Sequence, residues 1–206
     1  MGGINTLSNN IYVINLKHRE DRRTHILNEL SKIGCDNYKL IEAINGKDIN
    51  KPSKISVGAL GLANTYIKIH NEYDTTESVC LIEDDCVFLE NFNENLEQFI
   101  KNTPIDWDIL YFGGNHNYHI GRKTTQINEF CIKLNHTYTT HCLIMKKYVF
   151  DELINIISNV EIEVDVAMVK LQKKYNAYSS SDKLTTQLTG YSDIENAIID
   201  YSWLIK

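Results

Sequence analysis

The sequence predicts an α/β fold in which helices flank one central, mostly parallel sheet. Apolar runs of strand length alternate along the chain with segments of helical periodicity. The 206 residues, of which 43% are hydrophobic, are enough to build one sizeable core. Neither an internal repeat nor a linker rich in Pro, Gly or Ser divides the chain, so we expect a single domain over residues 1–206.

The first third of the chain predicts two strands that alternate with two helices. Residues 11–16, IYVINL, form a continuous apolar run, which is typical of a strand buried on both faces. A helix should follow at about 19–33, because its apolar residues share one face and Gly34 can end it. The segment YKLIE at 38–42 predicts a short strand, and small and apolar residues on one side of 58–73 predict a second helix.

The middle of the chain continues this alternation. The segment SVCLIEDDCVF, residues 78–88, begins as a buried strand and then carries three acidic residues in a row. Helical spacing returns at 92–102, and DWDILYFGG at 106–114 predicts another central strand that ends at a glycine pair. Residues 115–126 are polar and are expected to form a surface loop.

The last third is expected to complete the sheet and to add helices. Two short apolar runs at 129–134 and 137–145 predict either a hairpin or a strand that enters the sheet. Apolar residues at helical spacing in 149–160 and 164–175 predict two helices. The remaining tail should contain short strands or loops and a last helix from about Ile194.

Composition excludes several classes of protein. With 21 basic and 27 acidic residues the net charge is −6, which lacks the overall basic excess of a nucleic-acid-binding protein. No apolar run is long enough for a transmembrane segment, and the N-terminus lacks a secretory signal, so we expect a cytoplasmic location in a bacterium or a virus-infected host cell. The five cysteines form no CxxC pair, so we expect neither disulfides nor structural zinc.

Glu83, Asp84 and Asp85 directly follow a buried strand. Ligands of open α/β sheets bind beyond the carboxyl ends of the strands, and neighbouring carboxylates repel one another unless a cation offsets their charge. Since residues i and i+2 of an extended segment point the same way, Glu83 and Asp85 should face one ligand and Asp84 the other side. Such an all-oxygen site suits Mg²⁺ or Mn²⁺, and the alternative is a solvated strand end.

A second candidate site lies where the first strand meets the first helix. Residues 15–23, NLKHREDRR, place three arginines at a helix N-terminus, which attracts anions. Arginine side chains match phosphate oxygens, so the segment predicts binding of a phosphate or nucleotide. The alternative is a solvated first turn with ion pairs, for example between Asp21 and one arginine.

Several segments, taken in order, resemble glycosyltransferase family 25, which holds lipopolysaccharide sugar transferases and collagen galactosyltransferase domains. They are YVINLKHREDRR, GALGLANTY, LIEDD, DWDILYFGG, the pair Val164–Asp165, and later Gln187 with Ser192–Asp193–Ile194. The resemblance implies a Rossmann-like nucleotide-diphosphosugar transferase fold, called GT-A, with a UDP-sugar donor. It also implies a divalent metal, normally Mn²⁺, and inversion at the anomeric carbon.

The same resemblance implies roles for individual residues on the donor side. Glu83–Asp84–Asp85 matches the family's Asp-x-Asp motif, which bridges ribose, metal and diphosphate, so that Asp85 and Glu83 would bind metal, with Glu83 on the outer or ribose side. The residues that would line the uridine pocket are Asn15, Arg19 and Arg22. The residues that would close over the diphosphate or complete the metal shell are Gln187, Ser192 and Asp193.

Asp165 is the candidate catalytic base. An inverting transfer needs a carboxylate to accept the proton of the attacking hydroxyl, and the family carries a Val-Asp pair at this place. Glu163 is the alternative base, and an ordinary acidic residue at a helix N-terminus is the alternative role for Asp165. His141 stands where the family more often has a small residue, and we expect it to be a core histidine with satisfied hydrogen bonds.

The chain departs from the family at its second motif, where Ala59 follows Gly58 and Thr65–Tyr66 replace a Ser-His pair. We expect a metal-dependent, inverting transferase that moves galactose or glucose from a UDP-sugar to a hydroxyl of a glycan, lipid-linked sugar or protein. The departures leave open a non-catalytic module that binds nucleotide sugars. A third alternative is another metal enzyme, such as a nuclease or phosphohydrolase.

Overall fold

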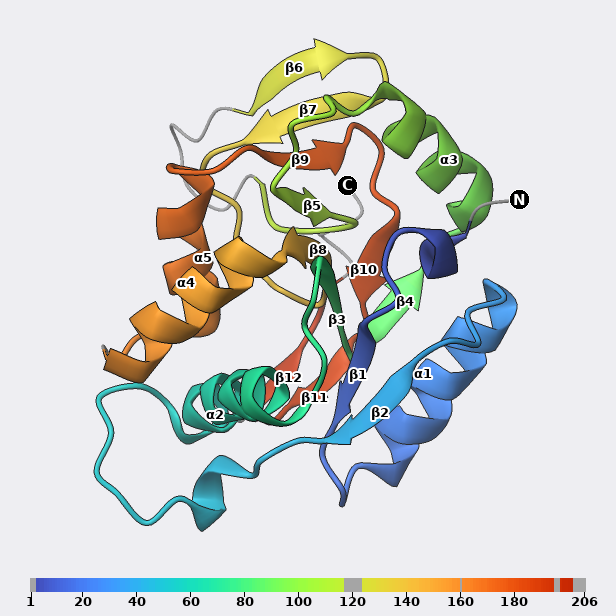
Figure 1. Ribbon diagram of the computed structural model, residues 1–206. Coiled ribbons are helices and arrows are strands. Elements are labelled where there is room, and N and C mark those ends of the chain that lie inside the picture. The colour runs from blue at the N-terminus through green and yellow to red at the C-terminus, as the bar shows by residue number, and fades with distance from the viewer. Residues whose placement is uncertain (1–2, 117–123, 160, 195–196, 202–206) are drawn as a thin grey trace.

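The computed structural model describes residues 3–116, 124–159, 161–194 and 197–201, and its main feature is one large sheet (Figure 1). The strands of this sheet are β1 (Ile11–Asn15), β2 (Lys39–Glu42), β3 (Ser78–Glu83), β5 (Ile109–Tyr111), β6 (Thr125–Asn128), β7 (Cys131–Leu134), β8 (Cys142–Lys146) and β9 (Ala177–Ser180). Their order in space is β2-β1-β3-β8-β5-β9-β7-β6. All of these strands except β7 and β8 run in one direction, so the predicted mostly parallel sheet is confirmed.

Helices cover both faces of the sheet. The helices α1 (Glu20–Lys32) and α3 (Phe92–Asn102) pack on one face. On the other face lie α2 (Val57–Glu72), α4 (Lys147–Asn159) and α5 (Val164–Gln172), which also contact one another. Short 3-10 helices occur at Ile4–Thr6 and Gly46–Asp48. The predicted α/β class is therefore confirmed.

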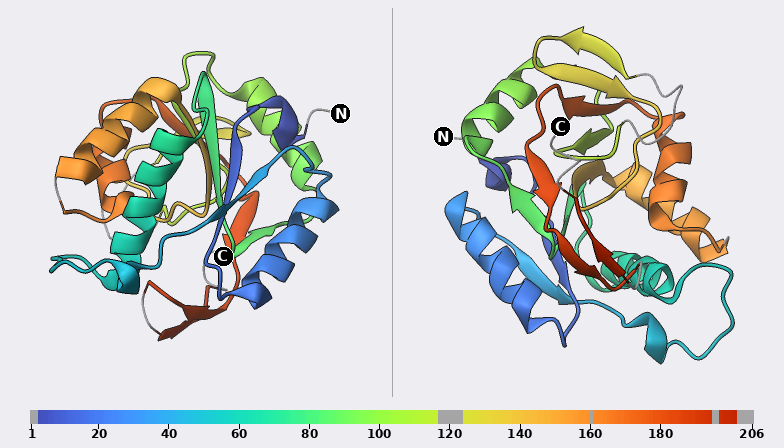
Figure 2. Two further views of the ribbon diagram at one scale, coloured as in Figure 1. Left: turned by 60° about the horizontal axis from the view of Figure 1, so that its bottom comes forward. Right: turned by 180° about the vertical axis from the view of Figure 1, so that it is seen from behind.

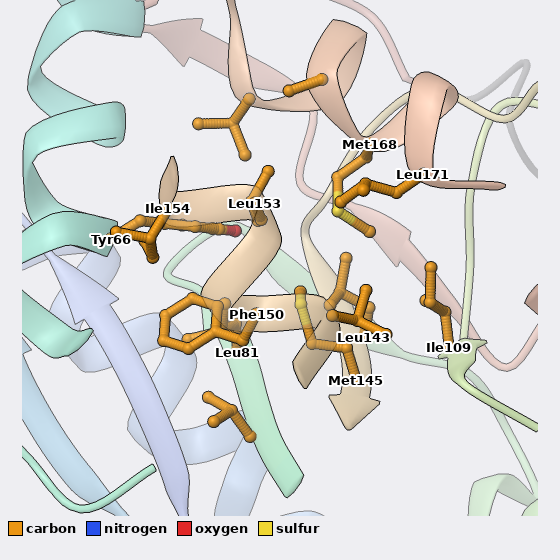
Figure 3. Close-up of a cluster of buried hydrophobic side chains, with 14 of the residues drawn as sticks. Tyr66, Leu81, Ile109, Leu143, Met145, Phe150, Leu153, Ile154, Met168 and Leu171 are labelled. Atoms are coloured by element: carbon orange, nitrogen blue, oxygen red, sulfur yellow. The ribbon is translucent and has the colours of Figure 1, made fainter. Parts of the chain in front are cut away.

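The two helical layers explain why the central strands are apolar without alternation. In β1, Ile11 and Val13 point into the core beneath α1 and α3, whereas Tyr12 and Ile14 point into the core beneath the other three helices. Every residue of β1 is buried, as expected for a strand that is covered on both faces. Figure 3 shows part of the second core, where Phe150 and Leu153 of α4 lie beside Leu81 of β3 and Leu143 of β8.

Two small ribbons complete the described structure. The strand β4 (Cys86–Phe88) pairs with β10 (Thr185–Gln187), and β11 (Gly190–Ser192) pairs with β12 (Ala197–Ile199). Both panels of Figure 2 show β11 and β12 between α1 and α2. No helix among the described residues is long and apolar enough to cross a membrane. All five cysteines are buried and free.

The structure decides between two alternatives for the C-terminal half and corrects two expectations there. Of the alternatives for the runs at 129–134 and 137–145, a strand that enters the sheet is confirmed, because β8 lies between β3 and β5, whereas β7 pairs with β6 and β9 and the two runs form no hairpin with each other. The last helix expected from Ile194 is wrong, since Ile194 lies in a turn and β12 follows, while residues 195, 196 and 202–206 lie outside the described residues. The loop expected at 115–126 gives way to β6 at Thr125, and its residues 117–123 lie outside the described residues.

Replacing a buried isoleucine of the inserted strand tests this packing. Ile144 of β8 is fully buried between neighbouring strands, so Ile144→Ala should lower the free energy of unfolding by about 2–5 kcal/mol through lost apolar contacts and a residual cavity. The matched control is Ile105→Ala, because the side chain of Ile105 is 100% exposed and its loss should change the free energy by less than about 0.5 kcal/mol. Urea denaturation measures both, and equal effects would contradict the assigned position of β8.

Candidate active site

The site begins where β1 and β3 end side by side. These strands are parallel, with Ile14 opposite Glu83, so their carboxyl ends meet at the same edge of the sheet. The next residues, Asp84 and Asp85, form a turn that leads into β4. The side chain of Asn15 donates a hydrogen bond of 2.7 Å to Asp84 Oδ2 across this edge. The structure therefore brings the first strand and the acidic cluster, which the sequence presented as two candidate sites, into one site.

Arg22 links the two aspartates. It lies in the first turns of α1, is only 8% exposed, and its Nη1 atom is 3.1 Å from Asp84 Oδ1 and 3.2 Å from Asp85 Oδ2. Glu83 instead accepts a hydrogen bond of 2.8 Å from the hydroxyl of Thr140. The expectation that Asp84 faces away from Asp85 is wrong, because β3 ends at Glu83 and the alternation of a strand no longer applies in the turn.

Burial controls the charge of this cluster. Burial raises the pKa of Glu83 to about 8, and the neighbouring Asp85 adds to that shift. Burial likewise raises the pKa of Asp84 and Asp85, while the positive charge of Arg22 opposes the shift. Burial disfavours the charged form of Arg22, yet the two aspartates raise its pKa overall. Burial therefore disfavours the charge of all three carboxyl groups in the ligand-free protein, and a bound cation would favour their charged forms.

The C-terminal residues 187–194, which we call segment 187–194, run past the same cluster. Gln187 Nε2 lies 3.4 Å from Asp85 Oδ2, and the backbone N–H of Leu188 donates a hydrogen bond of 2.7 Å to the carbonyl of Asp85. The carbonyl of Tyr191 accepts a hydrogen bond of 2.7 Å from Arg22 Nη2. The structure therefore brings the C-terminal motif to the acidic cluster, while the role expected for it, closing over a diphosphate or completing a metal shell, stays a prediction.

Arg19 is held by two carboxylates. Its guanidinium forms an ion pair with Asp193 of segment 187–194 and a second one, at 2.8 Å, with Asp21. The hydrogen bond to Asp21 and the proximity of Asp193 raise the pKa of Arg19, and the pKa of Asp21 is lowered in turn. The ion pair expected between Asp21 and an arginine therefore exists. The same arginine also pairs with Asp193, and this contact brings the first motif and the C-terminal motif together.

The second motif, GALGLANTY, brings other parts of the chain close to α2. A Cβ atom at Gly61 would lie 2.6 Å from the carbonyl oxygen of Ile44, and one at Gly58 would lie 2.4 Å from Cα of Ile194. Thr65 Oγ1 accepts a hydrogen bond of 2.9 Å from the N–H of Ile44. The motif is therefore mainly a packing motif, in which glycines permit close approach of neighbouring backbone.

Asp165 lies apart from the acidic cluster and is connected to it through residues 137–141, which precede β8. It is in the first turn of α5, where the backbone N–H groups of Val166 and Thr139 stabilise its charged form. Burial and the nearby Glu163 nevertheless raise its pKa. The residue after Thr139 is Thr140, which binds Glu83. Neighbouring residues of the stretch 137–141 therefore contact the candidate base, Asp165, and the candidate metal ligand, Glu83.

Buried polar atoms without hydrogen-bond partners concentrate around this site. Among the described residues they are Asn5 Oδ1, Arg22 Nε, Tyr66 Oη, Asp85 Oδ1, His116 Nε2, Thr139 Oγ1, His141 Nδ1, Thr186 Oγ1 and Gln187 Oε1. All of these except Asn5 lie on the segments that meet beyond the ends of β1, β3 and β5. Each such atom costs about 1–3 kcal/mol when it is left unpaired, so the distribution indicates where a polar ligand or water binds.

Each of two buried histidines in this region has a ring nitrogen that could bind a ligand, which the sequence did not indicate. His141 is fully buried, and its Nε2 lies 3.1 Å from Thr185 Oγ1, but Nδ1 has no partner among the described residues, so it is only half satisfied. His116 has the same pattern, with Nδ1 at 2.9 Å from Thr137 Oγ1 and with Nε2 unpaired within the part of the chain that the structure describes. Sequence reasoning also missed Thr140, although the polar run TYTT directly before an apolar strand marks a strand end.

The donor atoms suit a hard cation, although the described residues contain no group of three His, Cys, Asp or Glu side chains with metal-site geometry. Asp85 Oδ1 and Gln187 Oε1 are buried oxygen atoms without partners, and both oxygens of Asp84 are already engaged by Arg22 and Asn15. A set made only of carboxyl and amide oxygens fits Mg²⁺ or Mn²⁺. Asp85 is therefore the aspartate with an oxygen free to bind a metal.

Comparison with known proteins gives matches to one family. Residues 8–78 match the model of glycosyltransferase family 25 (LPS biosynthesis protein). Procollagen galactosyltransferase 1-A of Xenopus laevis is 27% identical over 143 residues, which cover 58% of this chain and 22% of the relative. The procollagen lysyl hydroxylase and glycosyltransferase of Acanthamoeba polyphaga mimivirus is 27% identical over 157 residues, 62% of this chain and 17% of the relative. The chain thus spans about a fifth of the length of these relatives.

Solved structures give weaker similarity. The A197 protein from STIV superposes with a TM-score of 0.48 at 12% identity, over 94% of both chains. The catalytic domain of Drosophila β1,4-galactosyltransferase 7 gives a TM-score of 0.45 at 9% identity, over 85% of this chain and 68% of the other. The resemblance predicted from the sequence motifs is confirmed by the family match and the curated relatives.

Removing the charge that links the aspartates should destabilise the fold. Arg22→Gln would leave Asp84 and Asp85 buried without their cation, so we expect a loss of about 3–5 kcal/mol in the free energy of unfolding at neutral pH. Arg23→Gln is the matched control, because Arg23 is an exposed arginine of the same helix and its replacement should cost less than about 0.5 kcal/mol. Urea denaturation measures the free energy of unfolding of both variants. Similar losses in the two would disprove the role of Arg22 as the partner of Asp84 and Asp85.

His141 should give the protein a specific sensitivity to acid. Burial lowers its pKa to about 3 from 6.5, so between these values the unfolded chain binds a proton that the folded chain does not. As the pH falls from 6.5 to 4.5, His141→Gln should gain stability relative to wild type by about 1.4 kcal/mol per pH unit. The difference between the two proteins must be measured, because Glu83 contributes the opposite pH dependence. A difference that does not vary with pH would refute this expectation.

Proposed function

We propose that this glycosyltransferase 25-like chain transfers a hexose from a UDP-sugar to a hydroxyl group, with a divalent cation and with inversion at the anomeric carbon. The observation that supports this most is the convergence of the first, acidic and C-terminal motifs on one cluster, which contains two arginines as well as buried oxygen atoms that have no partner among the described residues. A nucleotide diphosphosugar with a divalent cation suits both features, because arginines bind its phosphates and carboxyl and amide oxygens bind the cation.

The donor side of the site supplies positive charge and hydrogen-bond donors. Arg19 and Arg22 stand at the N-terminus of α1, where the helix dipole adds to their charge. Asn15 is fixed by its bond to Asp84. When the bond between sugar and phosphate breaks, negative charge grows on the leaving UDP, and groups that are already in place stabilise it without reorganisation. Asn15, Arg19 and Arg22 are therefore the proposed nucleotide-binding residues.

A cation would be held by Asp85 and Glu83, with Gln187 completing the set of oxygen ligands. Such a cation supplies Lewis-acid stabilisation to the departing diphosphate. Asp84 has a different role in this proposal, because both of its carboxylate oxygens are engaged, and it positions Arg22 and Asn15. Asp193 positions Arg19 in the same way.

Asp165 is the proposed base for the acceptor hydroxyl. A single displacement with inversion needs one carboxylate on the acceptor side, and the raised pKa of Asp165 makes it a better proton acceptor than an ordinary aspartate. Its place in the first turn of α5 fixes the carboxylate through backbone N–H groups. Glu163 is more exposed and makes no capping hydrogen bond in the described structure, so it is less well positioned for this role.

The catalytic alternative is favoured over a module that only binds nucleotide sugars. Ala59, Thr65 and Tyr66, which depart from the family pattern, are buried in α2, and Thr65 bonds the backbone of Gly61 and of Ile44. Burial raises the pKa of Tyr66 and Glu83 adds to that shift, so this departure lies beside the acidic cluster, whose contacts with Arg22 and Asn15 are nevertheless formed. The names of the curated relatives favour galactose as the transferred sugar. The hydroxyl of a glycan, a lipid-linked sugar or a protein is the proposed acceptor, and the cytoplasm the proposed location.

A donor assay tests the proposal. The protein is incubated with a panel of UDP-sugars and Mn²⁺, and release of UDP is followed with and without candidate acceptors. Asp165→Asn should slow transfer by about 10²–10⁴-fold through loss of the base, with little change in UDP binding. Asp85→Asn should abolish the dependence on Mn²⁺ together with activity.

Exposed Asp48 provides the control, and Asp48→Asn should retain full activity. If Glu163→Gln rather than Asp165→Asn removes activity, Glu163 is the base. Tight UDP binding without turnover in every condition would favour the non-catalytic module, and cleavage of nucleic acid or phosphate esters without UDP binding would overturn the proposal.

A further inference from the structure

Gly58 is the point at which segment 187–194 touches α2. A Cβ atom at this position would lie 2.4 Å from Cα of Ile194 and 2.6 Å from the carbonyl oxygen of Asp193. Both are backbone atoms, so no side-chain rotation could make room for a larger residue. A glycine is otherwise unfavourable within a helix, and Gly58 occupies the second residue of α2. The close approach of segment 187–194 explains its presence there.

The same segment is fixed at its other end and in its middle by polar contacts. At one end Leu188 donates to the carbonyl of Asp85, as described above. In the middle the carbonyl of Tyr191 accepts hydrogen bonds from Arg22 at 2.7 Å and from Arg19 at 3.4 Å. Directly before the contact with Gly58, Asp193 pairs with Arg19. The segment therefore spans from the acidic cluster to α2 and orders both arginines on the way.

We infer that Gly58 is a positioning residue for donor binding: by admitting the turn at Asp193 and Ile194, it holds segment 187–194 against Arg19 and Arg22. This inference rests on the proposed function, because it assigns the two arginines to the UDP-sugar. A bulkier residue at position 58 pushes Asp193 and the carbonyl of Tyr191 away from the guanidinium groups. Each arginine then loses the partners that segment 187–194 provides and keeps only its contacts with Asp21 or with Asp84 and Asp85, so that its remaining freedom must be lost when the donor binds.

The test compares the variant Gly58→Ala with the matched control Gly190→Ala. Gly190 lies in the same segment, but no described heavy atom outside its chain neighbours lies within 4 Å of a Cβ built there, so its replacement leaves the segment in place. In the protein without ligand, amide hydrogen exchange in segment 187–194 should be about tenfold faster in Gly58→Ala than in wild type, with β1 and β3 unchanged. The dissociation constant for UDP with Mn²⁺, from calorimetry, should rise about tenfold. Gly190→Ala should match wild type in both.

The exchange measurement needs no nucleotide, so it judges the role of Gly58 separately from the proposed function. Unchanged exchange in segment 187–194 of Gly58→Ala would overturn the inference, as would equal loosening in both variants. Wild-type protein that binds no UDP would overturn the proposed function and with it the donor-binding part of the inference. If Gly58→Ala fails to fold, Asp193→Asn weakens the contact between segment 187–194 and Arg19 instead. Unchanged hydrogen exchange in segment 187–194 of that variant would also overturn the inference.

Discussion

The pairing of Arg22 with Asp84 and Asp85 is the constraint on which the site depends. Three consecutive carboxylates at the end of a buried strand are unfavourable without a positive partner, because burial disfavours their charge and they repel one another. Arg22 supplies that partner from α1, and its two hydrogen bonds, at 3.1 and 3.2 Å, fix the start of this helix against the end of β3. A bound cation would favour the charged forms of these carboxyl groups in the same way as Arg22 does. The same arrangement thus stabilises the fold and prepares the site.

The insertion of β8 determines what surrounds the acidic cluster. Because β8 runs antiparallel to both β3 and β5, it begins at the edge where those two strands end. The residues before β8 therefore lie at the site, and they contribute Thr140 to Glu83 and His141 to Thr185. Thr139 adopts a positive φ of 69°, an unfavourable conformation for a β-branched residue, which is consistent with a loop that the surrounding contacts hold in place. A fully parallel sheet would have no such loop between the acidic residues and α5.

Local signals in the sequence predicted most helices and strands, whereas long-range pairing decided the rest. The helix at Glu20–Lys32 and the strand at Ile11–Asn15 follow from periodicity and a terminal glycine, which act over a few residues. The partners of β8 are far from it in sequence, and an apolar run does not specify which strands it joins. The direction of the Asp84 side chain was mispredicted, because the sequence does not show that the strand ends at Glu83 and that a turn begins there. The tail beyond Ile194 was mispredicted because its apolar residues fit a helix as well as a short ribbon.

The position of β8 also has a consequence for how the polypeptide acquires its shape during synthesis on the ribosome. The first three strands of the sheet can pair with one another as soon as they emerge, but the free edge of β3 stays open until β8 has been made. Until then a nascent chain exposes an apolar edge that invites association with other chains. Since β8 bridges β3 and β5, its arrival joins these two strands in a non-local step, which is the slow kind of step in folding, and β7 and β6 join the sheet only when β9 has been made.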